Sequence, residues 1–240
     1  MQLLILGASS NIGAALARVF APGNTLILAG RNVDRLAHTV ALCKESGAAD
    51  ANYVEVDFQL GIAPLLTAIA GKQIDLIIDA ASASSRLRDS DLSAGDITNL
   101  VSADFHNRTK LFEQVCGTAG PMPAVIFIST VLTLVKSPDR TVYTTLKTLY
   151  EAYLLKLKEG RPDFHLLVVY VGVVINREGP SKGPESLAAA VARSFQKGDD
   201  KLLYGTGGRM MVGLYYLQPL VYGMFTLAQR KVRRLFDPRS

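Results

Sequence analysis

Short apolar runs alternate with longer segments of helical periodicity along the chain. The apolar runs, rich in β-prone residues, lie at 3–6, 25–29, 53–56, 74–78, 125–128, 165–171 and 202–204. The helical patterns lie at 12–20, 33–46, 65–70, 97–116, 141–158 and 184–197. Strands that are apolar on both faces and are separated by helices need crossover connections, which place helices on both faces of a parallel sheet. The pattern therefore predicts an α/β fold with a doubly wound sheet of about seven parallel strands.

The composition narrows the class of protein. Of the 240 residues, 49% are hydrophobic and 20% are charged, which excludes disordered, collagen-like and coiled-coil chains. Cys43, Cys116 and the three scattered histidines have no metal-ligand spacing, so we predict neither a disulfide framework nor a metal site. The N-terminal residues lack a signal-peptide pattern, which predicts a cytoplasmic protein. The net charge is +5, and residues 230–240 alone carry +4, so we expect no nucleic-acid partner.

The first predicted strand ends in a glycine-containing turn that leads into a helix. The residues of this turn are Gly7, Ala8, Ser9, Ser10, Asn11, Ile12 and Gly13. Glycines let the backbone approach a pyrophosphate, and the helix N-terminus supplies free N–H groups and a favourable dipole. The turn predicts a dinucleotide site in a Rossmann fold. A tight strand-to-helix turn without a ligand would have the same glycine spacing.

Two further positions bear on the cofactor. Arg31 follows the second predicted strand, which ends in neither Asp nor Glu. A guanidinium at this place suits a 2′-phosphate, whereas a carboxylate suits the free ribose hydroxyl, so NADP(H) is favoured over NAD(H). A solvated arginine at the start of a helix is the alternative. Asp57, after the third strand, could accept from the adenine amino group or cap the next turn.

A candidate acid–base pair follows the fifth predicted strand. Tyr143 and Lys147 lie four residues apart in a helical pattern, so their side chains share one helix face. The preceding strand ends at Ser129, on the same predicted sheet edge as the glycine turn. A phenol beside an ammonium group can move a proton to or from a substrate oxygen, once the phenol pKa is brought from about 10 towards neutrality. An incidental pair on a partly exposed helix is the alternative.

These residues resemble the short-chain dehydrogenase/reductase family over nearly the whole chain. Further matching segments are Ile78-Asp79-Ala80-Ala81 and Ser129-Thr130-Val131. The resemblance implies that Tyr143 is the general acid/base, that Lys147 lowers its pKa, and that Ser129 hydrogen-bonds the substrate oxygen. It also implies a set of cofactor-binding residues: Gly7, Ser9, Ser10, Asn11, Ile12, Gly13, Arg31, Asp57, Ala80, Ala81, Tyr143, Lys147, Gly172 and Val174.

The chain departs from the family pattern at several of these motifs. Asn11 stands at the middle glycine, the Asn-Asn-Ala-Gly stretch has become Ile-Asp-Ala-Ala, and Val171-Gly172 replaces Pro-Gly after the sixth strand. The asparagine that usually completes a proton relay aligns best with Asp104. We therefore take Asp104 as a fourth candidate catalytic residue, with Asn107 as an alternative source of the relay.

We divide the chain into a cofactor-binding domain at 1–208, which includes the candidate catalytic residues, and an extension at 209–240. The region from Pro184 to Tyr204, together with this extension, resembles reductases that act on lipophilic or lipid-linked substrates. Residues 210–228 carry no formal charge but include Pro219 and two glycines, so a full membrane span is not expected. From Leu220 onward, apolar and basic positions favour different faces of a helix, as in interfacial helices. The extension is thus a peripheral membrane contact through residues 209–236, a lid over the pocket or a subunit interface.

The sequence predicts an enzyme that interconverts a ketone and a secondary alcohol with NADP(H), acting on a bulky, lipophilic or lipid-linked substrate. The resemblance implies a homodimer or homotetramer, and the extension would place the protein at the inner face of the membrane if it binds lipid. Two alternatives remain: an inactive NADP-binding regulator or scaffold, suggested by the altered motifs, and a sugar epimerase.

Overall fold

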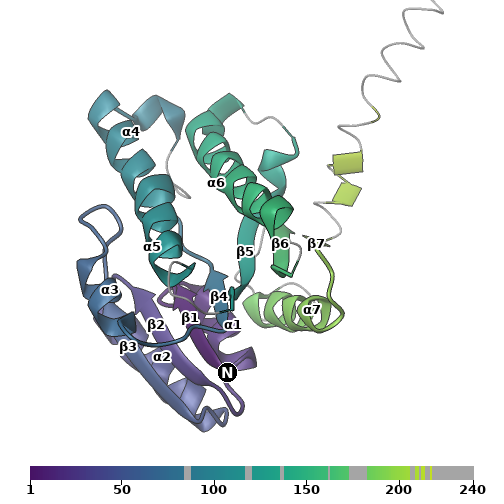
Figure 1. Ribbon diagram of the computed structural model, residues 1–240. Coiled ribbons are helices and arrows are strands. Elements are labelled where there is room, and N and C mark those ends of the chain that lie inside the picture. Colours follow the sequence, from purple (N-terminus) through teal and green to yellow (C-terminus); the bar gives the residue numbers. More distant parts are fainter. Residues whose placement is uncertain are drawn as a thin grey trace, which may run out of the picture.

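The computed structural model describes residues 1–83, 88–116, 121–135, 138–161, 163–172, 183–205, 209–210, 212–213 and 217. Within these residues, seven strands form one parallel sheet in the order β3-β2-β1-β4-β5-β6-β7 (Figure 1). The strands are β1 (Gln2–Leu6), β2 (Thr25–Gly30), β3 (Asp50–Glu55), β4 (Leu76–Asp79), β5 (Ala124–Thr130), β6 (Leu166–Val171) and β7 (Lys201–Tyr204). The predicted doubly wound Rossmann fold with a seven-stranded parallel sheet is confirmed.

Helices cover both faces of the sheet. On one face α1 (Asn11–Val19), α2 (Val33–Glu45) and α7 (Pro184–Gln196) share a hydrophobic cluster with the strands. On the other face α3 (Ala63–Ile69), α5 (Asn107–Cys116) and α6 (Thr141–Gly160) contribute to a second cluster. Because each central strand is buried on both faces, its apolar runs are nearly continuous, which is the pattern that reveals them in the sequence.

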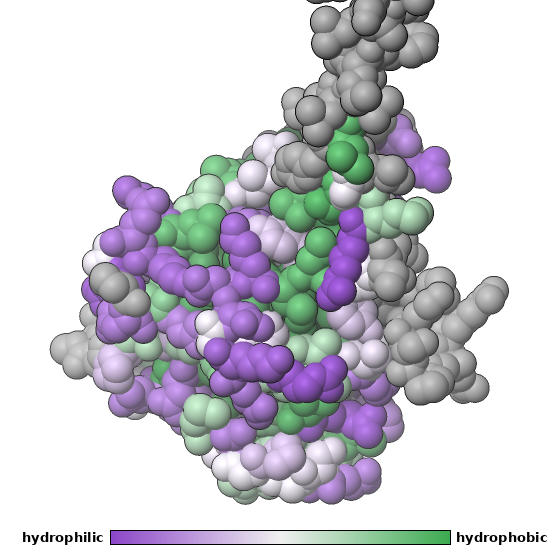
Figure 2. Space-filling model, turned by 90° about the vertical axis from the view of Figure 1, so that its right-hand side faces the viewer, coloured by the Kyte–Doolittle hydropathy of each residue, from purple (hydrophilic) through white to green (hydrophobic). Residues whose placement is uncertain are grey.

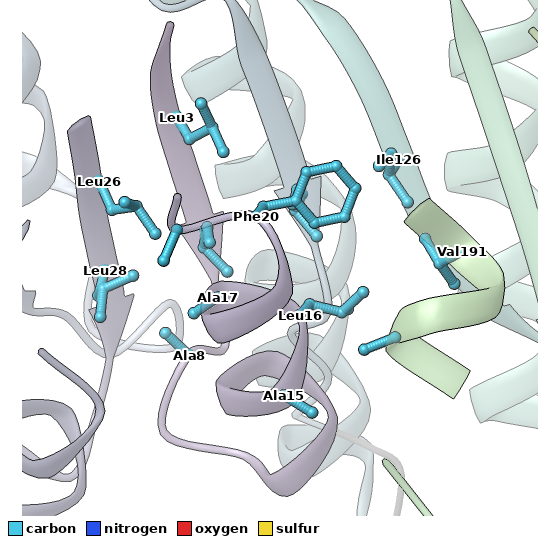
Figure 3. Close-up of a cluster of buried hydrophobic side chains, with 14 of the residues drawn as sticks. Leu3, Ala8, Ala15, Leu16, Ala17, Phe20, Leu26, Leu28, Ile126 and Val191 are labelled. Atoms are coloured by element: carbon cyan, nitrogen blue, oxygen red, sulfur yellow. The ribbon is translucent and has the colours of Figure 1, made fainter. Parts of the chain in front are cut away.

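The helix after the glycine turn packs at the centre of the first cluster. Leu16 of α1 is fully buried, and in Figure 3 it lies between the sheet and Val191 of α7, which is also fully buried. Burying a leucine or valine side chain contributes about 1.5–3 kcal/mol relative to leaving it exposed. These contacts fix the direction in which the N-terminus of α1 points along the sheet edge.

From β1 the chain adds β2 and β3 on one side of the sheet, and it then crosses back to add β4 to β7 on the other side, so the switch point lies between β1 and β4. Chains leaving adjacent strands in opposite directions open a crevice at the carboxyl ends, where α/β proteins bind ligands. The turn after β1 approaches β4 closely at this point. Gly7 has φ of 76°, and a Cβ atom there would lie 2.7 Å from the Ala81 amide nitrogen. Only glycine fits this position, because a side chain would collide with the β4 exit.

The structure corrects the predicted helix at 97–116. It consists of α4 (Ala94–Val101), one π-helical turn (Ser102–His106) and α5. Ser93 and Asp96 form a capping box that starts α4 at Ala94, three residues before the predicted start. β3 starts three residues before the predicted position, at Asp50.

Part of the sequence-based prediction lies outside the described residues. This part includes Val174 and most of the 209–240 extension. Among the described residues of the extension, Met210 is 66% exposed and Leu217 is 52% exposed. Figure 2 shows hydrophilic residues over much of the side that carries α7 and β7, with hydrophobic residues between them. No helix within the described ranges is long and apolar enough to cross a membrane.

Candidate active site

A cavity of about 530 Å³ lies at the carboxyl ends of the strands, at the topological switch point. Its lining comes from the segments that follow β1, β2, β3, β4, β5 and β6, from the π-helical turn, and from α2, α5 and α6. The predicted site residues that it brings together are Gly7, Ser9, Ser10, Asn11, Ile12, Arg31, Asp57, Ala80, Ala81, Asp104, Ser129, Tyr143, Lys147 and Gly172. Of the remaining two, Gly13 lies behind the turn and Val174 is outside the described residues.

The glycine turn is built to present a helix N-terminus to this cavity. Ser10 caps α1, and its hydroxyl oxygen accepts from the Gly13 amide at 3.0 Å. A Cβ atom at Gly13 would lie 2.2 Å from the Gly7 carbonyl oxygen, so the helix can approach the strand only with glycine there. The first residues of α1 thereby line the cavity, as a pyrophosphate requires. These residues fit a dinucleotide cofactor, because Ser9, Ser10 and Ile12 line the cavity at the N-terminus of α1.

Two arginines stand at the β2 end of the cavity. Arg31 approaches the Asp57 carboxylate at 4.0 Å, and both side chains are partly exposed. Asp57 also accepts from the Gln59 amide at 2.9 Å, so it caps the turn after β3 while lining the cavity. Arg35 of α2, which the sequence analysis missed, donates to the Asn11 side-chain oxygen and lines the same cavity. Its position one helical turn after Arg31 is the signal that could have revealed it.

Tyr143 lies in the first turn of α6 and is hydrogen-bonded to the Thr130 side chain. Burial raises the pKa of the phenol above its ordinary value, and the Asp104 charge adds to this effect. The hydrogen bond with Thr130 and the positive charge of Arg140 act in the opposite direction. In the protein alone the phenol is therefore protonated at neutral pH, whereas the sequence argument expects a lowered pKa.

The two hydroxyl residues at the end of β5 have different partners. Ser129, which is buried, donates to the Glu151 carboxylate of α6 at 3.4 Å. Tyr170 of β6 donates to the other oxygen of the same carboxylate. Thr130 is the residue whose hydroxyl meets the Tyr143 phenol. The structure thus gives the position beside the candidate acid/base to Thr130, while Ser129 lines the cavity with its hydroxyl turned to Glu151.

Two backbone carbonyls hold the ammonium group of Lys147 in place. Its Nζ donates to the carbonyl oxygens of Ile128 at 2.9 Å and Ala81 at 3.2 Å. The ammonium group also lies 4.8 Å from the centre of the Phe127 ring. Burial, with the nearby Arg108 charge, lowers the pKa of Lys147 to about 8. The side chain is fixed in place, with two of its three protons engaged by the backbone.

Asp104 is part of a buried ion-pair triad. Arg108 Nη2 lies 2.9 Å from Asp104 Oδ1, and Nη1 lies 3.2 Å from Asp79 Oδ2. All three side chains are at most 5% exposed. Asn107, the alternative relay residue, instead donates to the Phe58 carbonyl at 2.7 Å. No group of three His, Cys, Asp or Glu side chains among the described residues is arranged to hold a metal ion.

Comparison with known proteins agrees with this geometry. The family model for short chain dehydrogenases matches residues 2–160. The uncharacterized oxidoreductase Rv2073c of Mycobacterium tuberculosis is 28% identical, in a match that covers 82% of this chain and 85% of the relative.

Two solved structures show the same fold. A short-chain dehydrogenase from Sphingobium yanoikuyae in complex with NADPH is 20% identical, with a TM-score of 0.73 and coverage of 94% of this chain and 95% of that one. The bulky-bulky ketone specific alcohol dehydrogenase from Comamonas testosteroni is 19% identical, with a TM-score of 0.75 and coverage of 94% and 93%. The chain belongs to the short-chain dehydrogenase family and is an NAD(P)-dependent oxidoreductase.

Proposed function

We propose that this protein uses NADP(H) to interconvert a ketone and a secondary alcohol on a bulky, lipophilic or lipid-linked substrate. The observation that carries the proposal is the meeting of Thr130, Tyr143 and Lys147 in one cavity with the glycine turn of α1. A proton donor, a hydrogen-bonding hydroxyl and a fixed cation thereby lie beside a dinucleotide site.

When bound, the nicotinamide supplies or accepts the hydride at the carbon that bears the reacting oxygen. In the reducing direction, the Tyr143 phenol donates its proton to that oxygen. Thr130 holds the phenol in place by its hydrogen bond, and in this proposal its hydroxyl takes the substrate-binding role that the resemblance gives to Ser129. Lys147, held by two carbonyls, keeps a positive charge near the phenolate that forms.

Arg31 and Arg35 support the preference for NADP(H). Both are exposed at the β2 end of the cavity, where a dinucleotide fold places the adenosine ribose. A 2′-phosphate offers the oxygens that a guanidinium binds in charge-assisted pairs, whereas the 2′-hydroxyl of NAD(H) offers none of this charge. The partial pairing of Arg31 with Asp57, at 4.0 Å, leaves its guanidinium available for such a contact.

The apolar 209–240 extension supports the proposal of a greasy substrate and of a contact with the inner face of the membrane. Its residues 210–228 carry no charge, and basic side chains follow at 230–234. An apolar segment that covered the pocket would admit a lipophilic substrate without exposing it to water, and basic residues favour anionic lipid. In this proposal the protein is cytoplasmic and binds the membrane only at its surface.

Exposed hydrophobic residues on α4 and α6 support a homodimer or homotetramer. Ile97 and Val101 of α4 are 38% and 40% exposed, and Leu149 and Leu155 of α6 are 44% and 37% exposed. Burying such side chains against a second copy is favourable. A sedimentation mass of one chain would contradict this part of the proposal.

The test is reduction of a panel of bulky ketones with NADPH that carries deuterium at the reactive C4 position. We expect the label on the carbinol carbon of the product and a higher rate with NADPH than with NADH. Binding of NADPH without turnover of any ketone would favour the non-catalytic regulator. Inversion of a sugar carbon without net NADPH consumption would favour the epimerase.

A further inference from the structure

At two positions where the family pattern has asparagine, this chain has aspartate, and the side chain of one arginine lies between the two carboxylates. Asp79 and Asp104 stand where the resemblance expects asparagines, and Arg108 follows Asp104 by one helical turn. The side chain of Arg108 is 1% exposed, although arginine is almost never buried unless it is paired. Two carboxylates and the face of the Tyr150 ring, 5.6 Å away, surround the guanidinium. Burying charged side chains costs desolvation free energy, so we expect this group to serve the site that it adjoins.

The triad holds the segment that leaves β4, residues 80–83, at three points. Asp79 Oδ1 accepts from the Ala81 amide at 3.1 Å, and Asp104 Oδ1 accepts from the Ala83 amide at 3.0 Å. Arg108 Nη2 donates to the Ala81 carbonyl at 2.6 Å. This segment lines the cavity and contacts the glycine turn at Gly7. Its backbone is therefore fixed by charged side chains beneath it.

The Ala81 carbonyl connects this triad to the acid–base pair. It accepts from Arg108 Nη2 on one side and from Lys147 Nζ on the other. A displacement of this carbonyl would move the ammonium group, because the Ile128 carbonyl is its only other hydrogen-bond acceptor among the described residues. Arg108, Lys147, Asp79 and Asp104 together also carry no net charge. With asparagines in place of the two aspartates and without Arg108, Lys147 would leave a charge of +1.

We propose that Arg108 is a positioning residue of the acid–base centre: clamped between Asp79 and Asp104, its guanidinium fixes the Ala81 carbonyl and thereby the place of Lys147 relative to Tyr143. The inference rests on the proposed roles of Tyr143 and Lys147. The charged and titratable groups around this centre are Asp79 of β4, Asp104 of the π-helical turn, Arg108 of α5, Arg140 before α6, and Tyr143, Lys147 and Tyr150 of α6.

Arg108→Lys tests the geometry. A lysine keeps the positive charge but lacks the fork that reaches Asp79, Asp104 and the Ala81 carbonyl together. We expect kcat to fall about tenfold or more, because small misplacements of catalytic groups cost factors of this size. NADPH affinity should stay within about threefold, since the guanidinium is not placed at the phosphates. A folded variant with wild-type kcat would overturn the proposal.

Asp104→Asn tests the role of the carboxylate charge, because asparagine has nearly the same shape as aspartate but no charge. The amide oxygen can still accept from Ala83 and Arg108, but the negative charge near Tyr143 is lost. Tyr143 should then titrate about one pH unit lower, as should the falling limb of the reduction rate at high pH. Asp163→Asn, an exposed position before β6, is the matched control and should shift neither titration.

The Tyr143 titration can be read without a substrate, as the ultraviolet difference between each variant and the same variant carrying Tyr143→Phe. A downward shift in Asp104→Asn supports the proposal even if no ketone is found and the proposed function fails. An unchanged Tyr143 titration in folded Asp104→Asn overturns it. If Arg108→Lys does not fold, the titration of Asp104→Asn alone decides.

Discussion

At the scale of single residues, the hydroxyl beside Tyr143 belongs to Thr130, while that of Ser129 donates to Glu151. Thr130→Val removes this hydroxyl with little change in volume. We expect kcat/KM for ketone reduction to fall about 10²-fold, because a donor aimed at the reacting oxygen is worth about 2.7 kcal/mol. Ser129→Ala is the control and should change kcat/KM by less than about threefold. The opposite order of effects would return the catalytic role to Ser129.

The proposed preference for NADP(H) also depends on single side chains. Arg35→Leu should weaken NADPH binding about tenfold or more, because it removes the charge-assisted pair that we propose with the 2′-phosphate, and should leave NADH binding unchanged. Fluorescence titration with both cofactors measures this difference. Arg193→Leu, on the exposed side of α7, should affect neither cofactor. Equal losses for NADPH and NADH would place Arg35 outside the phosphate site.

At the scale of elements, the N-terminus of α6 is held by a carboxylate from the short helix Asp89–Asp91. Asp89 accepts from the amides of Thr141 at 2.6 Å and Val142 at 3.1 Å, just before Tyr143. Desolvation raises the pKa of Asp89, but these hydrogen bonds outweigh it and lower the pKa below its ordinary value. The stabilisation is therefore present above the unfolded pKa near 4 and is lost as the pH falls through the lower folded pKa.

Asp89→Ala should thus lower the melting temperature at pH 7, and the difference from the wild type should shrink as the pH is lowered. Because the cap fixes the start of the helix that carries Tyr143 and Lys147, we also expect kcat to fall about two- to tenfold. Calorimetry across pH measures the first effect. Asp91→Ala in the same short helix is the control. A difference in melting temperature that grows at low pH would contradict the account.

The elements also show what a sequence can and cannot reveal. The buried strands are evident as apolar runs, but the edge strand β3 begins with exposed Asp50 and Asn52, so its start is hidden. The face to which each hydroxyl turns at the end of β5 depends on the 3₁₀ turn Val131–Thr133 that follows. Arg108 resembles any surface arginine of a helix, because its partner Asp79 is distant in the sequence and its four-residue spacing from Asp104 is that of ordinary surface ion pairs.

At the scale of the whole molecule, the 209–240 extension is proposed to bind the membrane surface. Deleting residues 209–240 should release the protein from anionic liposomes, because the deletion removes both the apolar run and a net charge of +5, which equals that of the whole chain. Sedimentation with the vesicles measures the bound fraction, and neutral vesicles are the control. Equal binding by the full-length and truncated chains would remove the membrane contact from the account.

The most direct measurement of the central claim compares NADPH binding and ketone reduction in the wild type and in Tyr143→Phe. The phenyl ring keeps the packing of α6 but has no proton to give. The account predicts that NADPH fluorescence titrates as in the wild type while kcat falls by about 10²–10⁴. Full turnover by Tyr143→Phe would contradict the assignment of the acid–base centre.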